Sequence, residues 1–160
     1  MDVRTELHVE VDQMHGIEIE EWPARIAEVA MWLMDHQMNL EVSVEFGQPV
    51  VRLPLVRSAR IRRANALRVE WSDVLPASQC SFVLGNPPFV GKKEQNAQQK
   101  ADMELVWGDL RGAGTLDYVT CWYAKAADYL RGADTRAGFV STNSITQGEQ
   151  VGVLWTDLFR

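Results

Sequence analysis

The chain is poor in the residues that build metal sites and disulfide frameworks. Its 160 residues include 2 cysteines and 3 histidines, which show neither metal-ligand spacing nor a C-x-x-C motif. Cys80 and Cys121 each fall in an apolar segment, so we expect two buried free thiols. The sequence therefore predicts no metal centre and no disulfide-stabilised fold.

Long hydrophobic runs are also missing. No stretch approaches the roughly 18 consecutive apolar residues of a membrane helix. Residues 1–20 are mixed polar and acidic, without the apolar centre of a secretory signal. We therefore expect a cytoplasmic protein with no membrane partner.

The chain also lacks an excess of positive charge. The chain carries 16 Lys and Arg against 22 Asp and Glu, a net charge of −6. A protein that grips DNA through many phosphates should be basic, so this is not the composition of a complete DNA-binding protein. Short basic clusters occur at residues 57–63 and at Lys92-Lys93, and the second follows directly on the most informative motif.

Apolar periodicity predicts alternating strands and helices, which is typical of a parallel α/β sheet with right-handed crossovers. Residues 40–60 indicate a hairpin-like insertion that turns at Gly47-Gln48-Pro49. No linker divides the chain, so we expect one domain over residues 1–160. The expected strands are 16–20, 66–69, 80–84 and 137–141, and the expected helices are 22–38, 98–107, 116–130 and 147–159.

The most informative feature is the turn Asn86-Pro87-Pro88-Phe89. It follows the apolar run 80–84, which predicts a buried strand, and two prolines must stop that strand. Open α/β sheets bind ligands at the carboxyl ends of their strands. The Asn86 oxygen and the Asn-Pro carbonyl suit the two hydrogens of a planar amine such as adenine N6, and Phe89 suits stacking on its ring.

Two further strand ends carry polar side chains. Glu18 lies near the end of a strand that feeds a helix, where an acid accepts hydrogen bonds from ribose hydroxyls. Ile19 follows it and is placed to cover one face of an adenine. Taken alone, Glu18 is better explained as a helix N-terminal acid, and Asn65 at the next strand boundary is more often a turn residue. Together with Asn-Pro-Pro-Phe, the balance shifts toward cofactor binding.

The order and spacing of these segments resemble the successive motifs of class I DNA adenine-N6 methyltransferases. The likeness is greatest to the methyltransferase region of MmeI-like enzymes, which join restriction and modification in one chain. It covers about residues 12 to 160 and is carried by Gly16–Glu28, Gly85–Glu94 and Ser141–Gln150. The resemblance implies an incomplete Rossmann-like fold that binds S-adenosylmethionine.

The resemblance also implies a role for each motif residue. Glu18 would bind the ribose of S-adenosylmethionine, Ile19 would pack on its adenine, and Asn65 would contact that adenine's edge. Asn86 with Pro87 and Pro88 would hold the target amine, and Phe89 would stack on the flipped base of DNA. The catalytic set would then be Asn86, Pro87, Pro88 and Phe89, and the cofactor set Glu18, Ile19 and Asn65.

The family's Gly-rich loop, which follows its first strand, has no counterpart before Glu18. The single Gly-x-Gly, Gly112-Ala113-Gly114, follows no strand and is expected to be a flexible connection. The sequence therefore predicts a partial methyltransferase domain, without the first strand and the last strands and inactive alone. Open sheet edges and an apolar strip would make such a piece self-associate or leave it marginally stable.

Other functions remain open at this stage. Asn-Pro-Pro-Phe at a strand end is typical of amino-methyl transfer, but similar turns occur in enzymes that methylate glutamine in proteins or guanine in RNA. A non-catalytic α/β interaction module is a third hypothesis, in which the turn only ends a strand and Glu18 only caps a helix.

Overall fold

The computed structural model describes residues 8–49 and 57–160 of the chain. The chain divides into two units, residues 1–66 and residues 67–160. This division into units does not test whether residues 1–160 act together as one partial catalytic domain, so that stays a prediction.

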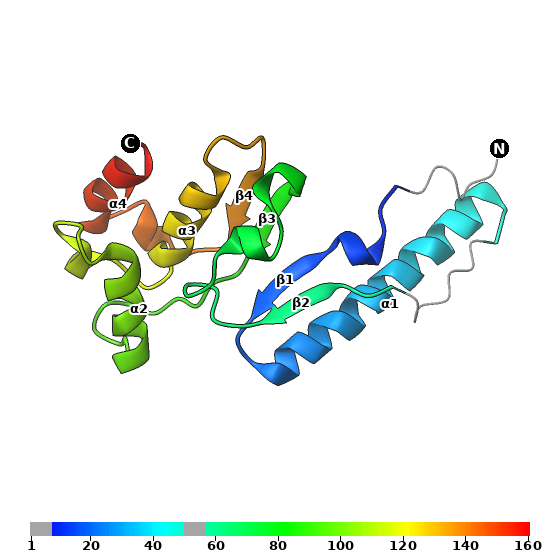
Figure 1. The fold of residues 1–160 in the computed structure, drawn as a ribbon, viewed down its shortest axis with the longest axis horizontal. Helices are drawn as coiled ribbons and strands as arrows, with labels where there is room; N and C mark the ends of the chain where they lie inside the picture. Colours follow the sequence, from blue (N-terminus) through cyan, green and yellow to red (C-terminus); the bar gives the residue numbers. More distant parts are fainter. Residues whose placement is uncertain (1–7, 50–56) are drawn as a thin grey trace. The chain divides into compact units, whose positions relative to one another are not determined.

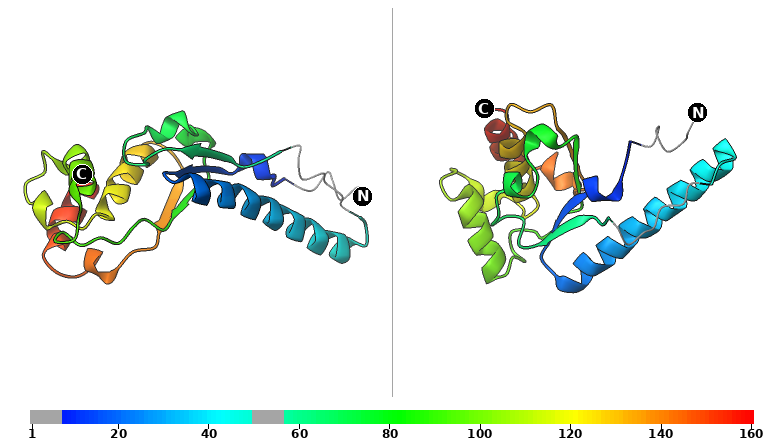
Figure 2. Two further views of the ribbon diagram at one scale, coloured as in Figure 1. Left: turned by 90° about the horizontal axis from the view of Figure 1, so that it is seen from below. Right: turned by 45° about the vertical axis from the view of Figure 1, so that its right-hand side comes forward.

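The first unit is a parallel strand pair with one long helix. Strands β1 (His15–Glu18) and β2 (Arg60–Arg63) run parallel, with Glu18 opposite Arg63 at their carboxyl ends. Helix α1 (Glu21–Phe46) lies along this pair (Figures 1 and 2). A 3₁₀ turn at Val11–Gln13 precedes β1. The expected strand at 16–20 and the helix after it are confirmed.

Helix α1 is longer than its sequence pattern indicates. The expected helix ended at residue 38, whereas α1 continues to Phe46, so the first half of the expected hairpin is wrong. Gly47 ends the helix in the left-handed conformation with φ 61°, which glycine adopts without steric cost. A short alternation of apolar residues does not stop a helix that is already propagating. Residues 50–56 of the expected hairpin lie outside the described residues.

The apolar stripe of α1 is on its exposed side. Ile26 and Leu33 are 62% and 57% exposed, whereas the buried positions of the helix are Ala24 and Asn39. Trp32 is half-buried and donates from Nε1 to the carbonyl of Arg57 at 3.0 Å. Periodicity therefore identified residues that share a face of the helix, but not the face that packs on β1 and β2.

Strand β2 also differs in position from the expected strand at 66–69. The paired residues are Arg60–Arg63, and residues 66–68 form a turn. Arg60, Arg62 and Arg63 are exposed, so this strand has no apolar signal that a sequence pattern would detect.

The second unit combines a parallel strand pair with three helices. Strands β3 (Phe82–Gly85) and β4 (Arg136–Phe139) pair with Gly85 opposite Phe139. Helix α3 contacts β4 and also contacts both α2 and α4 (Figure 1). None of the helices in the described ranges is long and apolar enough to span a bilayer. The helices are α2 (Ala97–Trp107), α3 (Thr120–Leu130) and α4 (Gln150–Leu158), and the 3₁₀ turns are Trp71–Asp73, Ala77–Gln79, Ala113–Thr115 and Asn143–Ile145.

Parallel pairing and mixed strand and helix content are confirmed, but the expected single sheet is not. Within the described residues the strands form two separate two-stranded sheets. The expectation that residues 80–84 are buried is wrong, because Phe82 and Leu84 are 65% and 81% exposed. An apolar run indicates side chains that are stable when another element packs on them. In β3 no described element buries the alternate side chains Phe82 and Leu84.

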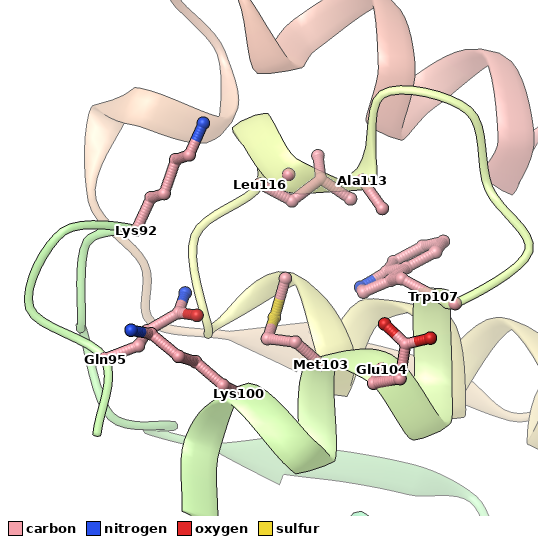
Figure 3. A pocket seen from close by; sticks show the side chains of 10 residues that line it. Lys92, Gln95, Lys100, Met103, Glu104, Trp107, Ala113 and Leu116 are labelled. Carbon is pink, nitrogen blue, oxygen red and sulfur yellow. The ribbon is translucent and has the colours of Figure 1, made fainter. Parts of the chain in front are cut away.

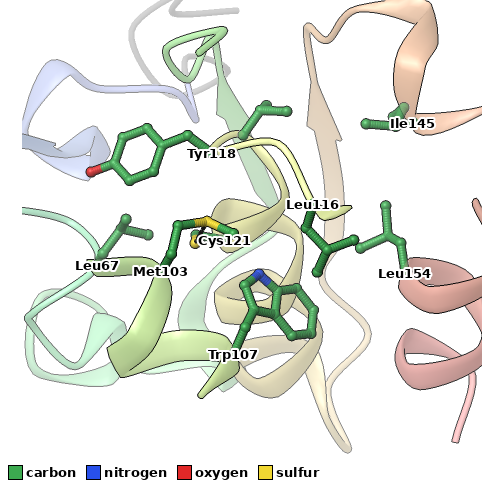
Figure 4. Packing of buried hydrophobic residues seen from close by; sticks show 9 residues of the cluster. Leu67, Met103, Trp107, Leu116, Tyr118, Cys121, Ile145 and Leu154 are labelled. Carbon is green, nitrogen blue, oxygen red and sulfur yellow. Dashed lines mark hydrogen bonds between the residues drawn. The ribbon is translucent and has the colours of Figure 1, made fainter. Parts of the chain in front are cut away.

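The core of the second unit lies between its three helices. One buried hydrophobic cluster joins these helices (Figure 4), and it includes Met103 and Trp107 of α2, Cys121 of α3, Leu154 of α4 and also Val119. The remaining buried members of this cluster are Leu67, Leu116, Tyr118 and Ile145.

This core contains a buried carboxylate. Asp102 is 1% exposed and accepts hydrogen bonds from Arg68 Nε and the Tyr118 hydroxyl, both at 2.7 Å. Pairing with a cation and a hydroxyl offsets the cost of burying the charge. The network ties the start of the second unit to helix α2 and to the segment before α3.

Candidate functional site

The Asn-Pro-Pro-Phe turn follows the carboxyl end of β3, as the sequence predicts. Pro87 is buried and anchors the turn, whereas Asn86, Pro88 and Phe89 are exposed. Phe89 remains 45% exposed, so its ring is open to a stacking partner. The two side chains with the relevant chemistry therefore face outward from a fixed backbone.

Gly85 fixes the approach to this turn. A β-carbon on Gly85 would lie 3.1 Å from Cδ1 of Phe139, which is closer than side chains normally pack. The amide of Val140 donates to the carbonyl of Gly85 at 3.0 Å and closes the strand ladder beside Asn86. Strand β4 thus sets where the turn begins.

The far end of the turn is held by the segment before α3. The amide of Tyr118 donates to the carbonyl of Val90 at 3.0 Å. Gly91 lies close to the same segment, since a β-carbon there would be 3.8 Å from Oδ1 of Asp117. Backbone contacts therefore hold the turn at both ends, from Gly85 to Val90.

Asp117 links this segment to the residues that follow β4. Its Oδ2 accepts hydrogen bonds from Ser144 Oγ at 2.7 Å and from Gln150 Nε2 at 2.8 Å. Gln150 in turn accepts at Oε1 from the Asp117 amide at 3.0 Å, and Ser144 shares a 2.6 Å hydrogen bond with Thr142. The Ser-Thr-Asn-Ser motif is thus coupled to the turn through one carboxylate. The sequence indicated the motif but not Gln150.

The predicted cofactor residues lie in the first unit. The amide of Ala64 donates to the carbonyl of Glu18 at 2.9 Å, which continues the pairing of β1 and β2 by one step. Asn65 follows, so both predicted side chains belong to the carboxyl edge of one parallel pair. Ile19 is 54% exposed, as a residue that covers a ligand ring would be in its absence.

Glu18 also has a local structural role. Its Oε1 accepts a hydrogen bond from the Glu20 amide at 2.9 Å, just before α1 begins. One oxygen of Glu18 therefore orders the helix entrance, as expected of a helix N-terminal acid, and its role toward a ribose stays a prediction. A carboxylate with one fixed and one available oxygen fits a ribose hydroxyl.

Two buried groups near the core, the Cys121 thiol and the Tyr118 hydroxyl, keep their protons at neutral pH. Burial, with a smaller contribution from the charge of Asp102, raises the pKa of the Cys121 thiol to about 12. Burial and the hydrogen bond to Asp102 raise the pKa of the Tyr118 hydroxyl. Cys121 is a buried free thiol as expected, whereas Cys80 is only partly buried.

Sequence analysis missed a cavity in the second unit. It has a volume of about 330 Å³ and lies between the loop after the turn, helix α2 and the segment 113–116. Lys92 and Gln95 lie at one side, and Trp107 and Glu104 at the other (Figure 3). Only the Lys92-Lys93 pair had indicated chemistry in this region.

The whole chain, residues 1–160, matches the family described as MmeI, DNA-methyltransferase domain. The chain belongs to this family. The resemblance read from Gly16–Glu28, Gly85–Glu94 and Ser141–Gln150 is confirmed.

Two relatives support membership of the MmeI methyltransferase family. The chain is 43% identical over 155 residues to a DNA methyltransferase A from Bacillus subtilis (strain 168), matching 95% of this chain and 18% of that protein. It is 55% identical, with a TM-score of 0.91, to the type IIL restriction-modification enzyme MmeI solved in complex with DNA, matching 99% of this chain and 21% of that one. The chain thus spans about a fifth of the length of each relative.

Proposed function

We propose that this chain belongs to the catalytic domain of an enzyme that transfers a methyl group from S-adenosylmethionine to adenine N6 in DNA. The supporting observation is the turn after β3, where buried Pro87 presents exposed Asn86 and Phe89. Family membership supports DNA methylation within a restriction-modification system. The proposal includes a Rossmann-like arrangement of strands around the cofactor.

The turn supplies hydrogen-bond acceptors and a stacking surface. The Asn86 side-chain oxygen and the Asn86 carbonyl accept the two hydrogens of the target amine. Accepting both hydrogens favours a tetrahedral nitrogen, whose lone pair is then free to attack a methyl carbon. Phe89 stacks on the flipped base and offsets part of the cost of unpairing it, at about 1–3 kcal/mol per stacked base.

The first unit carries the groups that would hold the cofactor. S-Adenosylmethionine, when bound, supplies an electrophilic methyl group. The available oxygen of Glu18 would accept from a ribose hydroxyl, exposed Ile19 would cover the adenine, and Asn65 would contact the edge of that ring. The nitrogen–methyl bond would form as the carbon–sulfur bond of the sulfonium breaks. The methylated amine, which then carries a positive charge, would lose one proton to water, so no charged base is assigned.

Cofactor binding is tested by titration calorimetry of the chain with S-adenosylmethionine. We expect Glu18→Ala to abolish the binding heat and Glu41→Ala, an exposed acid on α1, to leave it unchanged. Wild-type chain that gives no heat at millimolar cofactor, or equal binding by Glu18→Ala, would contradict the assigned cofactor site.

Methyl transfer is tested in a chimera. The chain spans about a fifth of MmeI, so in the chimera it replaces the matching residues of that enzyme. The transfer of labelled methyl groups from S-adenosylmethionine is then measured. We expect methyl incorporation into adenine of DNA, lost with Asn86→Ala and kept with Gln98→Ala, an exposed amide on α2. RNA and glutamine-containing peptides serve as alternative acceptors. Incorporation into either one instead of DNA would refute the assigned substrate, and no Asn86 dependence would favour a non-catalytic module.

A further inference from the structure

The cavity in the second unit has a built polar side. Lys92 and Gln95 come from the loop after the turn, and Lys100 comes from the second turn of α2 (Figure 3). Its volume of about 330 Å³ is at the lower end of the range of pockets that hold small ligands or parts of larger ones. The cavity is not part of the site assigned above to the target base or to the cofactor.

Gln95 provides an independent indication of a ligand. Its side chain is 9% exposed, and its Nε2 atom is buried with no hydrogen-bond partner among the described residues. Buried amide donors without a partner are rare in folded proteins, because desolvation is not repaid. Gln95 lines the cavity, so a rotation of its amide toward the cavity would let an acceptor placed there satisfy this donor.

The charges around the cavity specify the kind of acceptor. Lys92 and Lys100 add two ammonium groups to the Gln95 donor, so this side is complementary to an oxyanion. Glu104 lies at the other side, beside Trp107 (Figure 3). The Trp107 Nε1 atom donates to Thr120 Oγ1 at 3.1 Å, so Trp107 offers the cavity an apolar ring and no free donor.

The position of the cavity identifies the source of the oxyanion. Lys92 is three residues from Phe89, so their Cα atoms are at most about 11 Å apart. A strand whose base stacks on Phe89 therefore carries its own phosphates within reach of the lysine. Phosphate contacts of this kind fix the register of a nucleic acid without reading its sequence.

We infer that the cavity binds a phosphodiester group of the nucleic acid beside the target nucleotide, with Lys92, Gln95 and Lys100 as donors. The inference rests on the proposed function for the identity of the polymer. Its role is positioning: the captured phosphate sets the strand so that one base reaches Asn86 and Phe89.

The test is fluorescence anisotropy of a fluorescein-labelled DNA duplex titrated with the chain at several salt concentrations. We expect Lys92→Glu and Lys100→Glu each to weaken binding about tenfold and to flatten the salt dependence by about 0.9 per lost phosphate contact. The matched control is Lys93→Glu, the same charge change on an exposed neighbour that does not line the cavity. It should change affinity less than about twofold.

Gln95→Leu separates ligand binding from folding. The substitution keeps the side chain's bulk and removes the orphan donor, so we expect weaker DNA binding with no loss of thermal stability. Glu104→Gln should bind DNA more tightly, because a negative charge leaves the cavity. Loss of stability without loss of affinity in Gln95→Leu would overturn the inference.

Three further outcomes would overturn it. One is equal weakening by Lys93→Glu, which would show general charge attraction. Another is no binding of the wild-type duplex at low salt. The third is displacement of the duplex by inorganic phosphate or a mononucleotide at equal phosphate concentration, which would show a free-anion site.

The chimera distinguishes failure of this inference from failure of the proposed function. If the cavity variants keep full DNA affinity while the chimera methylates adenine, only the phosphate site is wrong. If Lys92→Glu and Lys100→Glu weaken binding while no acceptor is methylated, the phosphate site stands and the assigned reaction is wrong.

Discussion

Gly85 and the ring of Phe139 are in direct contact across the β3–β4 pair. A β-carbon on Gly85 would lie 3.1 Å and 3.2 Å from two ring carbons, and the ring is itself packed edge-on against Tyr123 at 5.3 Å between centroids. The ring therefore has little freedom to withdraw. This contact sets the position from which the Asn-Pro-Pro-Phe turn leaves the sheet.

Gly85→Ala should therefore destabilise the second unit by about 1–3 kcal/mol, the usual cost of overpacking. Urea unfolding measures the change. Gly152→Ala is the control, because nothing lies within 4 Å of its added β-carbon in α4 and alanine favours a helix by about 0.8–1 kcal/mol. Equal stability of the two variants would show that the Phe139 ring moves freely.

Asp117→Ala should loosen the turn through the loss of two charge-assisted hydrogen bonds. Ser144 and Gln150 would both lose an acceptor, and we expect a loss of about 1.5–3 kcal/mol together with slower methyl transfer in the chimera. Asp128→Ala removes an exposed carboxylate at the other end of α3 and should change neither quantity. Unfolding curves and initial transfer rates measure both effects, and an unchanged rate with Asp117→Ala would remove its positioning role.

Alkaline pH should unfold the second unit through Cys121. The folded pKa is raised from 9.0 to about 12, so the folded chain keeps its proton when the unfolded chain has lost it. The free energy of unfolding is unaffected by this thiol below pH 9. Above pH 9 it falls by up to about 1.4 kcal/mol per pH unit, because only the unfolded chain loses the proton.

Urea unfolding at pH 8, 9 and 10 measures this slope. Cys121→Ala should be less stable at pH 8, because it leaves a cavity, but should lack the decline that begins at pH 9. An unchanged slope in the variant would assign the decline to other groups, such as Tyr129, whose pKa burial raises to about 12.

Self-association is expected through the uncovered side of β3, with a second copy as the partner. Phe82 and Leu84 of β3 are 65% and 81% exposed, and Val140, directly after β4, is 57% exposed. Leu84→Glu should shift sedimentation equilibrium toward the monomer. Leu105→Glu, on a 62% exposed position of α2, should not. A wild-type chain that remains monomeric at millimolar concentration would contradict this expectation.

Sequence patterns located most elements because their signals are local. Two prolines end β3 as predicted, and the alternation of strand and helix indicates parallel pairing, which both strand pairs confirm. The end of α1 at Gly47 was missed, because the prediction assigned that glycine to a hairpin turn. Burial was predicted less well. The run 80–84 and the stripe on α1 are apolar, but apolar character does not say whether a partner covers it.

The candidate site shows the same division. Asn86, Phe89 and Glu18 carry recognisable chemistry at strand ends, so a single sequence is enough to propose them, and their roles stay predictions. Gln95 and Gln150 have no such signal, because their importance comes from what folding places beside them: a cavity for the first and a carboxylate for the second. Strand β2 was misplaced because its arginines give no apolar pattern.

The three-way hydrogen bonding of Asp117 has a consequence for protein engineering. Segments taken from different relatives would meet at Asp117 and Tyr118, because the Asp117 carboxylate binds Ser144 and Gln150 after β4, while the Tyr118 amide binds Val90 in the turn after β3. Transplanting the Asn-Pro-Pro-Phe segment alone would separate it from the residues that brace it. The transferable cassette is residues 85–150, exchanged as one block.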